Sequence, residues 1–585
     1  MKPLAPLAVY TFLWGFSTQL EAIKGPLGGP LGPWVISLLL LCLAAAMRPQ
    51  NTPLVTMAYS MRIVWWLTRW PMMWASEIIG GLTDLAVVLH LVVQDGDDSS
   101  VLTEYLSTSM RRQTAWFYFF AGFWKLNTSF LDHRYSCASV FFAQLLDAYV
   151  PPHLLTATLA ELAIRAAPAV TVAIEVGVGV LMLLGEWSAR CRAAGVALAL
   201  ALHVGIDITP MPHNIANFSH KIGLRCLWFL PYGASAAAQE VLRRPLLVGA
   251  AYVALAAAAL VATQQPHVWA RWTAAPWDSV RTLDVRAVDW HVGAHAALTI
   301  LLLRGLTIGE SDGSTTVGGA RGPPPPPRSR RVLVHFNALL CVLWAGGTVV
   351  LGTSDNSTPN MYSNLRQQGG SNHLLPIPFS LLPRSRYHGH GVSSDPFSGG
   401  LVRIERHNSS RMSGYCPAET TPHLSAGAIA LLKRFGHSGR VFNPAFALNI
   451  GPHAMPPRPD GPFVRYTLPA YELRRQLRDA IAAAESFELV YSSLPGATGD
   501  EQWRVHASGR TVKLLVARGA RVACTVLAAG SSDAASTCQP DDLALAPFPS
   551  RDYWARPLDA FFGGLQSWNP QPILWEDQTE IHCYG

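Results

Sequence analysis

The sequence predicts a multi-pass α-helical membrane domain with some interfacial helices, followed by a smaller C-terminal lumenal or extracellular domain that is α+β or mostly β. Two observations predict this class. First, 50% of the 585 residues are hydrophobic and only 14% are charged, against roughly 25% charged in a typical soluble domain. Second, long apolar runs fill the chain up to residue 351, whereas Pro, Gly, Ser and Arg recur from residue 353 onward.

Composition divides the chain into four parts. These are a membrane domain at 1–305, a Pro/Gly-rich basic linker at 306–331, a last transmembrane helix at 332–352 and a C-terminal non-membrane domain at 353–585. The linker has five consecutive prolines followed by Arg328, Arg330 and Arg331, so we expect it to be disordered or PPII-like and cytoplasmic. The C-terminal domain then lies on the lumenal side, and the endoplasmic reticulum is the expected membrane.

Apolar and amphipathic patterns predict the helices in order. We expect a membrane-associated segment in 1–23 and then helices at 34–47, 54–70, 71–94, 139–149, 153–165, 168–187, 193–208, 245–263, 288–303 and 332–351. The polar stretch 95–113 is predicted to be a loop. In the C-terminal part we expect a helix at 468–486 and strands at 488–492, 511–517 and 521–527.

Charge and cysteine usage narrow the function classes. The net charge of +7 is modest and spread out, so no nucleic-acid partner is expected. None of the nine cysteines forms a CxxC, which leaves zinc without support. The last four, Cys416, Cys524, Cys538 and Cys583, allow three pairings in a lumenal domain; free buried thiols are the alternative.

A metal site is also not expected in the helix predicted at 71–94. It carries Glu77, Asp84 and His90. A spacing of seven places the two carboxylates on one face of a helix, but His90 falls off that face. One histidine and two carboxylates that do not share a face form a weak metal-binding pattern.

One cation, Lys125, ends an aromatic run that starts at Ala115. A lysine in such a place either extends its amine to the membrane interface or is desolvated. Desolvation disfavours the charged form of an amine and allows it to act as a base. The residues alone leave both interpretations open.

The segment Ala121-Gly122-Phe123-Trp124-Lys125-Leu126 resembles the AG-x-x-KL segment of the HTTM (horizontally transferred transmembrane) superfamily, which includes vitamin K-dependent γ-glutamyl carboxylase. Three further segments match in the expected order. They are Ala173-Ile174-Glu175 ahead of Glu186-Trp187, Leu202-His203 followed by Asn217-Phe218-Ser219, and Met361–Arg366 running into Gly369–Leu375. The resemblance spans roughly residues 50–375. Residues 376–585 show no match to the peptide-binding or C-terminal β-domains of the carboxylase.

The resemblance implies that Lys125 is the base that deprotonates reduced vitamin K (the hydroquinone). Oxygenation then gives a strong base that removes a γ-proton from a glutamate of a protein or peptide substrate, and carbon dioxide adds to the carbanion. The chain would be an enzyme of the carbon–carbon lyase class. The same motifs occur in HTTM proteins with no assigned reaction. The alternative is therefore a non-enzymatic membrane protein that binds lipid or quinone, or acts as a scaffold, with Lys125 in a structural role.

The matched segments also supply the other candidate site residues. The resemblance implies Lys125, His203 and Glu175 as catalytic, Trp124, Phe218 and Ser219 as cofactor-binding, and Arg366, Asn372 and His373 as substrate-binding, with no metal. Structural alternatives remain open for the ionisable ones. Glu175 would be a helix-packing carboxylate, His203 a hydrogen-bonded core histidine, and Arg366 one half of an interdomain ion pair.

Overall fold

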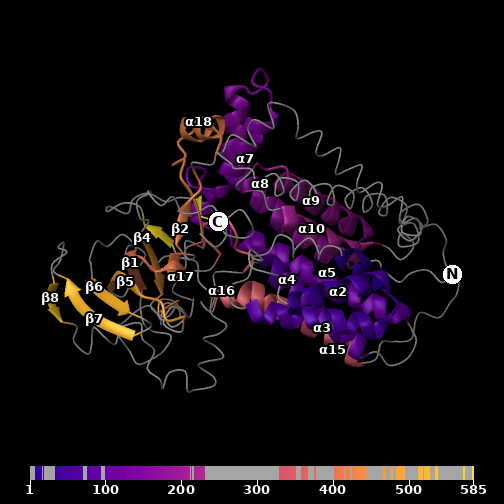
Figure 1. Ribbon diagram of the computed structural model, residues 1–585. Helices are drawn as coiled ribbons and strands as arrows, with labels where there is room; N and C mark the ends of the chain where they lie inside the picture. Colours follow the sequence, from indigo (N-terminus) through magenta and orange to yellow (C-terminus); the bar gives the residue numbers. More distant parts are fainter. Residues whose placement is uncertain are drawn as a thin grey trace.

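The computed structural model of the chain is shown in Figure 1. The structure describes residues 7–8, 10–15, 18, 33–69, 75–93, 99–210, 213, 216–230, 328–350, 358–365, 374–376, 401–413, 416–421, 424–444, 465–469, 473, 476–477, 483–493, 511–517, 520–527, 534–537, 571–573 and 583–584. The helices predicted at 245–263 and 288–303, and the linker up to residue 327, lie outside the described residues.

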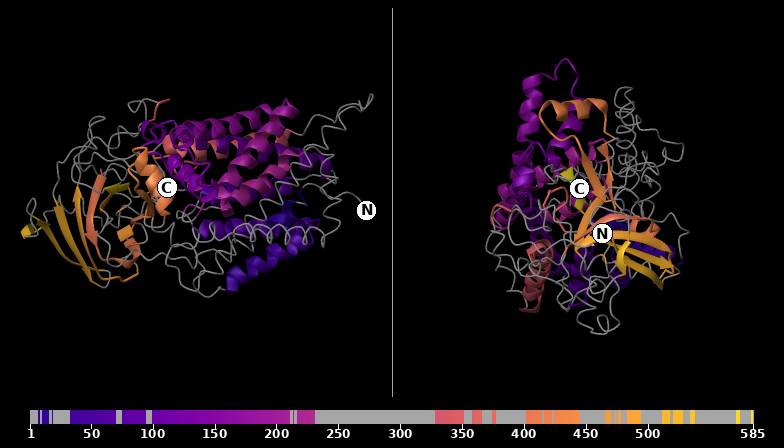
Figure 2. Two further views of the ribbon diagram at one scale, coloured as in Figure 1. Left: turned by 90° about the horizontal axis from the view of Figure 1, so that it is seen from above. Right: turned by 90° about the vertical axis from the view of Figure 1, so that its left-hand side faces the viewer.

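The larger part of the described structure is a helical bundle that lies to one side of a β-sheet, as the views in Figures 1 and 2 agree. Its helices are α2 (Pro33–Met47), α3 (Thr52–Arg69), α4 (Ala75–Val92), α5 (Ser99–Phe123), α6 (Thr128–Leu131), α7 (Cys137–Tyr149), α8 (Ala157–Leu184), α9 (Ala189–Asp207), α10 (Ala216–Cys226), the 3₁₀ turn η1 (Leu227–Phe229), α15 (Arg328–Val342), the π-helical turn η3 (Leu343–Gly347) and α16 (Thr348–Val350). The predicted helices at 34–47, 54–70, 139–149 and 193–208 are confirmed as α2, α3, α7 and α9.

Four helical segments in the described part of the chain are long and apolar enough to cross a membrane. They are Ala75–Val92, Ala157–Leu184, Ala189–Asp207 and Ser329–Val350. The last of these confirms the helix predicted at 332–351, but the helix begins earlier. Arg328 to Arg331, expected in the linker, form the first turn of α15.

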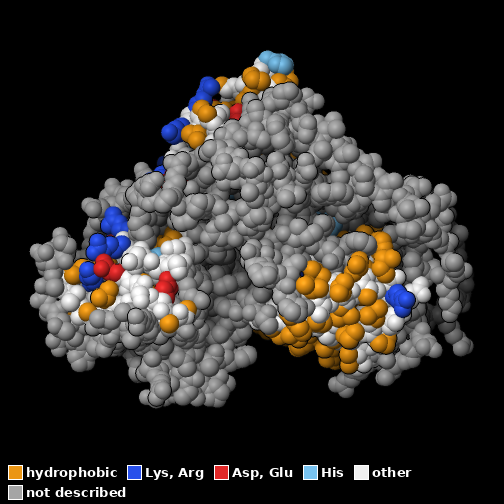
Figure 3. Space-filling view, viewed as in Figure 1, with side chains coloured by type: hydrophobic (Ala, Val, Ile, Leu, Met, Phe, Trp, Pro, Cys, Tyr) orange, Lys and Arg blue, Asp and Glu red, His pale blue; other side chains and the backbone are white. Residues whose placement is uncertain are grey.

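The outer surface of the bundle is apolar. Figure 3 shows hydrophobic side chains gathered where α2, α3 and α15 lie in Figure 1. Large apolar residues are exposed on each of these helices, among them Trp34, Leu40, Met57, Leu67 and Phe336. An apolar surface of this extent is unusual for a monomeric soluble protein, so it agrees with the low charged fraction in associating the bundle with a membrane.

The prediction of a loop at 95–113 is wrong, because α5 begins at Ser99 and continues to Phe123. The polar side chains in its first half find partners on neighbouring elements. Arg112 forms an ion pair with Glu186 at 2.6 Å, and Arg111 Nε donates to the Trp228 carbonyl at 2.6 Å. Polarity here reflects hydrogen bonding between helices, which a pattern of hydrophobic residues does not reveal.

Two helices predicted at 153–165 and 168–187 are in fact one, α8, which contains Pro168. A proline inside a helix lacks an N–H and leaves the carbonyl four residues earlier without its donor. Here that carbonyl belongs to Ile164, and the hydroxyl of Ser139 on α7 donates to it at 3.1 Å. Ser139 and Ile164 are fully buried. The hydroxyl therefore replaces the missing backbone donor and lets α8 continue.

We predict that Ser139→Ala lowers the free energy of unfolding by about 1–3 kcal/mol, because it leaves a buried carbonyl without a donor. In a Pro168→Ala background the helix supplies its own N–H to Ile164, so the same Ser139→Ala change should cost much less. Unfolding of the four proteins of this double-mutant cycle in detergent measures the coupling. Equal costs in both backgrounds would contradict the account.

The C-terminal part is an α+β domain built on two sheets. Its strands are β1 (Leu401–His407), β2 (Pro417–Glu419), β3 (Val441–Pro444), β4 (Arg465–Pro469), β5 (Phe487–Ser493), β6 (Thr511–Ala517), β7 (Ala520–Leu527), β8 (Ala534–Thr537), β9 (Gln571–Ile573) and β10 (Cys583–Tyr584), with helices α17 (Ser410–Ser413) and α18 (Ala426–Arg434). The seven-stranded sheet has the order β8-β7-β6-β5-β1-β4-β9, and the other sheet the order β10-β3-β2.

The predicted strands at 488–492, 511–517 and 521–527 are confirmed as β5, β6 and β7, and neighbouring strands of the larger sheet run antiparallel. The predicted start of the helix at 468 is wrong, because Leu468 and Pro469 form the end of β4 and pair with β1. Of its remaining residues, Leu473, Gln476 and Leu477 are helical.

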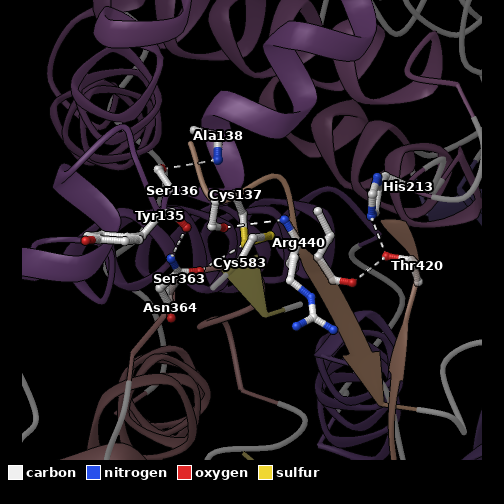
Figure 4. The surroundings of a disulfide bond; sticks show 12 residues. Tyr135, Ser136, Cys137, Ala138, His213, Ser363, Asn364, Thr420, Arg440 and Cys583 are labelled. Carbon is white, nitrogen blue, oxygen red and sulfur yellow. Dashed lines mark hydrogen bonds between the residues drawn. A yellow bond between two sulfur atoms is a disulfide. The ribbon is translucent and has the colours of Figure 1, made fainter. Parts of the chain in front are cut away.

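A disulfide joins the two parts of the chain (Figure 4). Cys137 at the start of α7 is bonded to Cys583 in β10, across 446 residues of sequence. The expectation that the last four cysteines pair among themselves is therefore wrong for Cys583, and Cys416 is a free thiol. The spacing of cysteines in the sequence cannot reveal this disulfide, because it depends on the fold: β10 pairs with β3 and thereby lies next to α7.

Hydrogen bonds around the disulfide continue the junction between the two parts. His437 Nε2 donates to the Ser136 carbonyl at 3.3 Å, while its Nδ1 accepts from the Gly439 N–H at 2.9 Å. Ser425, the N-cap of α18, donates to Asp147 of α7 at 2.6 Å. Both nitrogens of His437 are thus used in its neutral form. Burial lowers the pKa of His437 from 6.5 to about 4.

We predict that His437 makes the junction sensitive to acid. Because its pKa is lower in the folded than in the unfolded chain, its contribution is complete above about pH 6.5 and is lost as the pH falls toward 4, to a maximum of about 3 kcal/mol. The free energy of unfolding of the wild type should therefore fall more steeply between pH 7 and 4.5 than that of His437→Gln, whose amide does not titrate. Parallel pH profiles for the two proteins would rule out this role.

Candidate functional site

The site is built where α5 and α8 cross. Gly122 of α5 and Gly179 of α8 have no side chain, and a Cβ on either would lie 2.6 Å from an atom of the other helix. Small residues allow such close backbone approach between helices. Gly122 faces Val176 and Glu175, so the close contact brings the residues that follow it on α5 against the middle of α8.

This contact pairs Lys125 with Glu175. The amine Nζ lies 3.0 Å from Oε1 and 2.8 Å from Oε2 of the carboxylate; the Lys125 side chain is buried, and that of Glu175 is 12% exposed. Lys125 also donates to the Ala121 carbonyl at 3.3 Å, and its Nζ lies 5.9 Å from the centre of the Phe130 ring. Lys125 is only 6% exposed. It points into the protein and not toward the membrane interface.

A turn after α5 holds Lys125 in this position. Asn127 caps α6 by accepting from the Phe130 N–H at 2.8 Å. Its side-chain amide donates to the Trp124 carbonyl at 2.9 Å and to the Ser363 carbonyl at 2.8 Å. Asn127 also forms a β-bridge with Leu374. The first and last of the matched segments, more than 200 residues apart, therefore lie side by side.

Lys125 and Glu175 line a cavity of about 300 Å³. Its walls come from α5, α7, α8, α9, α10 and the turn before residue 363, and consist mainly of apolar and aromatic side chains. The lining residues are Phe117, Tyr118, Ala121, Lys125, Phe130, Ala138, Phe141, Phe142, Leu145, Thr171, Ile174, Glu175, Leu198, Ala201, Leu202, His203, Gly205, Ile206, Thr209, Phe218, Pro359, Met361 and Tyr362.

A second polar group of the cavity is His203. Its Nε2 lies 2.6 Å from Tyr118 Oη and its Nδ1 lies 3.0 Å from Ser219 Oγ. The Phe218 ring packs against the imidazole with centroids 5.2 Å apart. The hydroxyls of Tyr118 and Ser219 thus fix the orientation of the imidazole.

The structure therefore gathers four of the candidate residues, Lys125, Glu175, His203 and Phe218, around one cavity. Ser219 does not line the cavity, but its hydroxyl is hydrogen-bonded to His203, which does. Trp124 is placed elsewhere: its indole donates to the Ala345 carbonyl at 2.8 Å and packs with Val349, Leu365 and Leu374, away from the cavity. Arg366, Asn372 and His373 lie outside the described residues.

Sequence reasoning missed Tyr118 and Tyr362. Tyr118 sits within an aromatic run and carries no signal of its own, except that it precedes Lys125 by two helical turns. Tyr362 adopts a left-handed backbone conformation with φ of 54° and contacts Phe141. A bulky residue at positive φ is rare and marks a site where the surroundings impose the conformation.

Comparison with known proteins concerns the C-terminal part of the chain. A family described as a domain of unknown function (DUF8388) matches residues 371–557, which include strands β1 to β8 and none of the described cavity residues. No curated protein and no solved structure matches the chain.

The side chains that line the cavity determine which reactions it can support. The described residues contain no group of three or more His, Cys, Asp and Glu side chains that could hold a metal ion. The cavity instead offers an amine with a carboxylate at one place, an imidazole with a phenol at another, and aromatic walls between. Such a site can bind a largely apolar ring and exchange protons with polar groups on it.

We predict that the stability of the protein depends on both members of the Lys125–Glu175 pair. Either Lys125→Met or Glu175→Gln should lower the free energy of unfolding by about 3 kcal/mol, because each leaves one buried charge without its partner. The double variant should recover a large part of that loss.

A matched control lies on the same helix. Glu161 and Arg165 form an exposed pair at 2.9 Å, so Glu161→Gln should change stability by less than about 1 kcal/mol. Additive losses in the double variant of Lys125 and Glu175, measured by unfolding in detergent, would show that the two groups do not interact.

Proposed function

We propose that the chain is a multi-pass membrane protein of the HTTM type that binds a lipid-soluble quinol in this cavity, with Lys125 as the base that deprotonates it. One observation carries the proposal. Lys125, Glu175, His203 and Phe218 come from three separately matched segments, and all four line the same cavity. Their position around one internal space supports a shared role in binding a ligand.

The cavity residues fit reduced vitamin K. A volume of about 300 Å³ lies at the lower end of the range of about 300–1,000 Å³ that small-molecule sites span. Aromatic rings such as Phe117, Phe130 and Phe218 suit the flat faces of a quinol ring. Its hydroxyls require polar partners, which Lys125 with Glu175 and His203 with Tyr118 supply.

A role for Lys125 as base involves Glu175. Lys125 must be neutral before it accepts a proton, and the carboxylate 2.8 Å away is placed to take the proton that the amine carries. After Lys125 has taken the proton of the quinol, its ammonium would donate to the unprotonated oxygen of Glu175, which keeps the proton that it took from the amine.

Two features support a membrane orientation with the C-terminal domain in the lumen, with the endoplasmic reticulum as the proposed membrane. Arg112, Arg192 and Arg331 lie near the ends of α8 and α15 that point away from the C-terminal domain, as the excess of basic residues on the cytoplasmic side requires. The disulfide between Cys137 and Cys583 is typical of an oxidising compartment.

The proposed reaction is carboxylation of glutamate in a protein or peptide substrate. A bound hydroquinone supplies, through its oxidation, the strong base that removes the γ-proton. The chain would supply the polar partners for the quinol, the first proton acceptor, and a cavity that excludes water.

The test uses purified protein in lipid nanodiscs with vitamin K hydroquinone, oxygen, labelled carbon dioxide and a glutamate-containing peptide. We expect labelled peptide from the wild type and a loss of about 100-fold or more with Lys125→Met. Arg165→Met, which removes an exposed cation from α8, is the matched control and should keep full activity. A folded wild type that binds the hydroquinone and incorporates no label would contradict the carboxylase proposal.

The alternative is an HTTM-type protein that binds lipid or quinone, or acts as a scaffold, without catalysing a reaction. The buried ion pair of Lys125 and Glu175 favours it, because such a pair can serve to orient α5 on α8. In that case the Lys125→Met/Glu175→Gln double variant should still bind the quinol, and no condition should yield labelled peptide.

A further inference from the structure

The cavity has an opening on one side. Of the described residues that line it, Ala201 of α9 alone is exposed at the surface. One turn further along α9 is Gly205, which also lines the cavity, and a Cβ built on it would meet no atom within 4 Å. The wall formed by α9 is therefore incomplete at these two small residues.

The packing of α8 on α9 explains this opening. At the end of the pair that is farther from Lys125, a Cβ on Gly195 would lie 3.1 Å from Met182. Closer to the cavity, a Cβ on Gly177 finds its nearest atom, on Leu198, at 3.9 Å. At Gly205 nothing is within reach. Gly205 therefore lines the cavity without a packing partner at its Cβ position, and Thr171 and Ile174 of α8 also border the cavity.

The surroundings of the gap are apolar. Both α8 and α9 are among the helices long and apolar enough to cross a membrane. Val170 of α8 and Val204 of α9 are exposed next to the gap at 39% and 37%. With α8 and α9 in a bilayer, the exposed apolar residues beside the gap would face hydrocarbon.

We infer that the gap bordered by Thr171, Ile174, Ala201 and Gly205 is a lateral portal that holds the hydrocarbon tail of a lipid ligand. The inference rests on the proposed function, in that the polar ring of the same ligand occupies the cavity. The ligand class is an amphiphile with one polar aromatic head and a long single chain. A cavity of about 300 Å³ is small for head and chain together, so the chain leaves through the gap into the bilayer.

Two variants and two probes test the portal. Gly205→Trp fills the gap, while Val180→Trp places the same bulk at an exposed position of α8 that does not line the cavity. The probes are vitamin K₁ hydroquinone, which has a long tail, and menadiol, which has the same ring without one. Their dissociation constants are measured in nanodiscs, with thermal unfolding as the check on folding.

We expect Gly205→Trp to weaken the long-tailed probe by about tenfold or more and to leave menadiol within about twofold of the wild type. Val180→Trp should change neither. Equal weakening of both probes, or of neither, would overturn the portal while the proposed function stands. A wild type that binds neither probe would overturn the proposed function itself, and the portal with it.

A second measurement does not depend on the folding of a variant. A quinone with a photoreactive diazirine in its tail is crosslinked to the wild type, and the labelled residues are mapped by mass spectrometry. Labels on 171–174 and 201–206 support the portal. Labels confined to other helices overturn it, and competition by menadiol establishes that the head occupies the cavity.

Discussion

The close contact of α5 and α8 is the constraint on which the rest of the site depends. Gly122 and Gly179 lack the side chains that would keep the helices apart, and the close contact brings Lys125 against Glu175. A buried amine requires a partner, and the carboxylate of α8 supplies it. Three residues of the Ala-Gly-x-x-Lys-Leu segment thus have a physical role. Ala121 lines the cavity, Gly122 allows the close approach of α8, and Lys125 forms the ion pair.

Other parts of the structure preserve this contact. Ser139 accompanies the continuation of α8 past Pro168 by bonding the Ile164 carbonyl, so Glu175 lies within one long helix and not near a helix end. Asn127 ties the turn after Lys125 to the chain around Ser363. The disulfide of Cys137 then joins α7, which forms one wall of the cavity, to the C-terminal domain. Changes in that domain can therefore reach the cavity through α7.

Sequence patterns predicted several of the described apolar helices and three strands of the larger sheet, and the resemblance singled out Lys125, Glu175 and His203, which line one cavity. Such features depend on local periodicity or on motifs with little freedom. The patterns failed where tertiary partners decide. The polar half of α5 is helical because Glu186 and Trp228 satisfy its arginines, and Pro168 is tolerated because of Ser139. Tyr118, which contacts His203, could not be told from its aromatic neighbours without the fold.

The central claim is that the space beside Lys125 holds the ring of a membrane lipid. An experimental density map of the protein in nanodiscs made with quinone-containing native lipids tests it most directly. The account predicts a flat density between Lys125 with Glu175 and His203 with Tyr118, continued by a narrow density past Gly205. A cavity closed by the surrounding side chains, or filled only by ordered water, would contradict it.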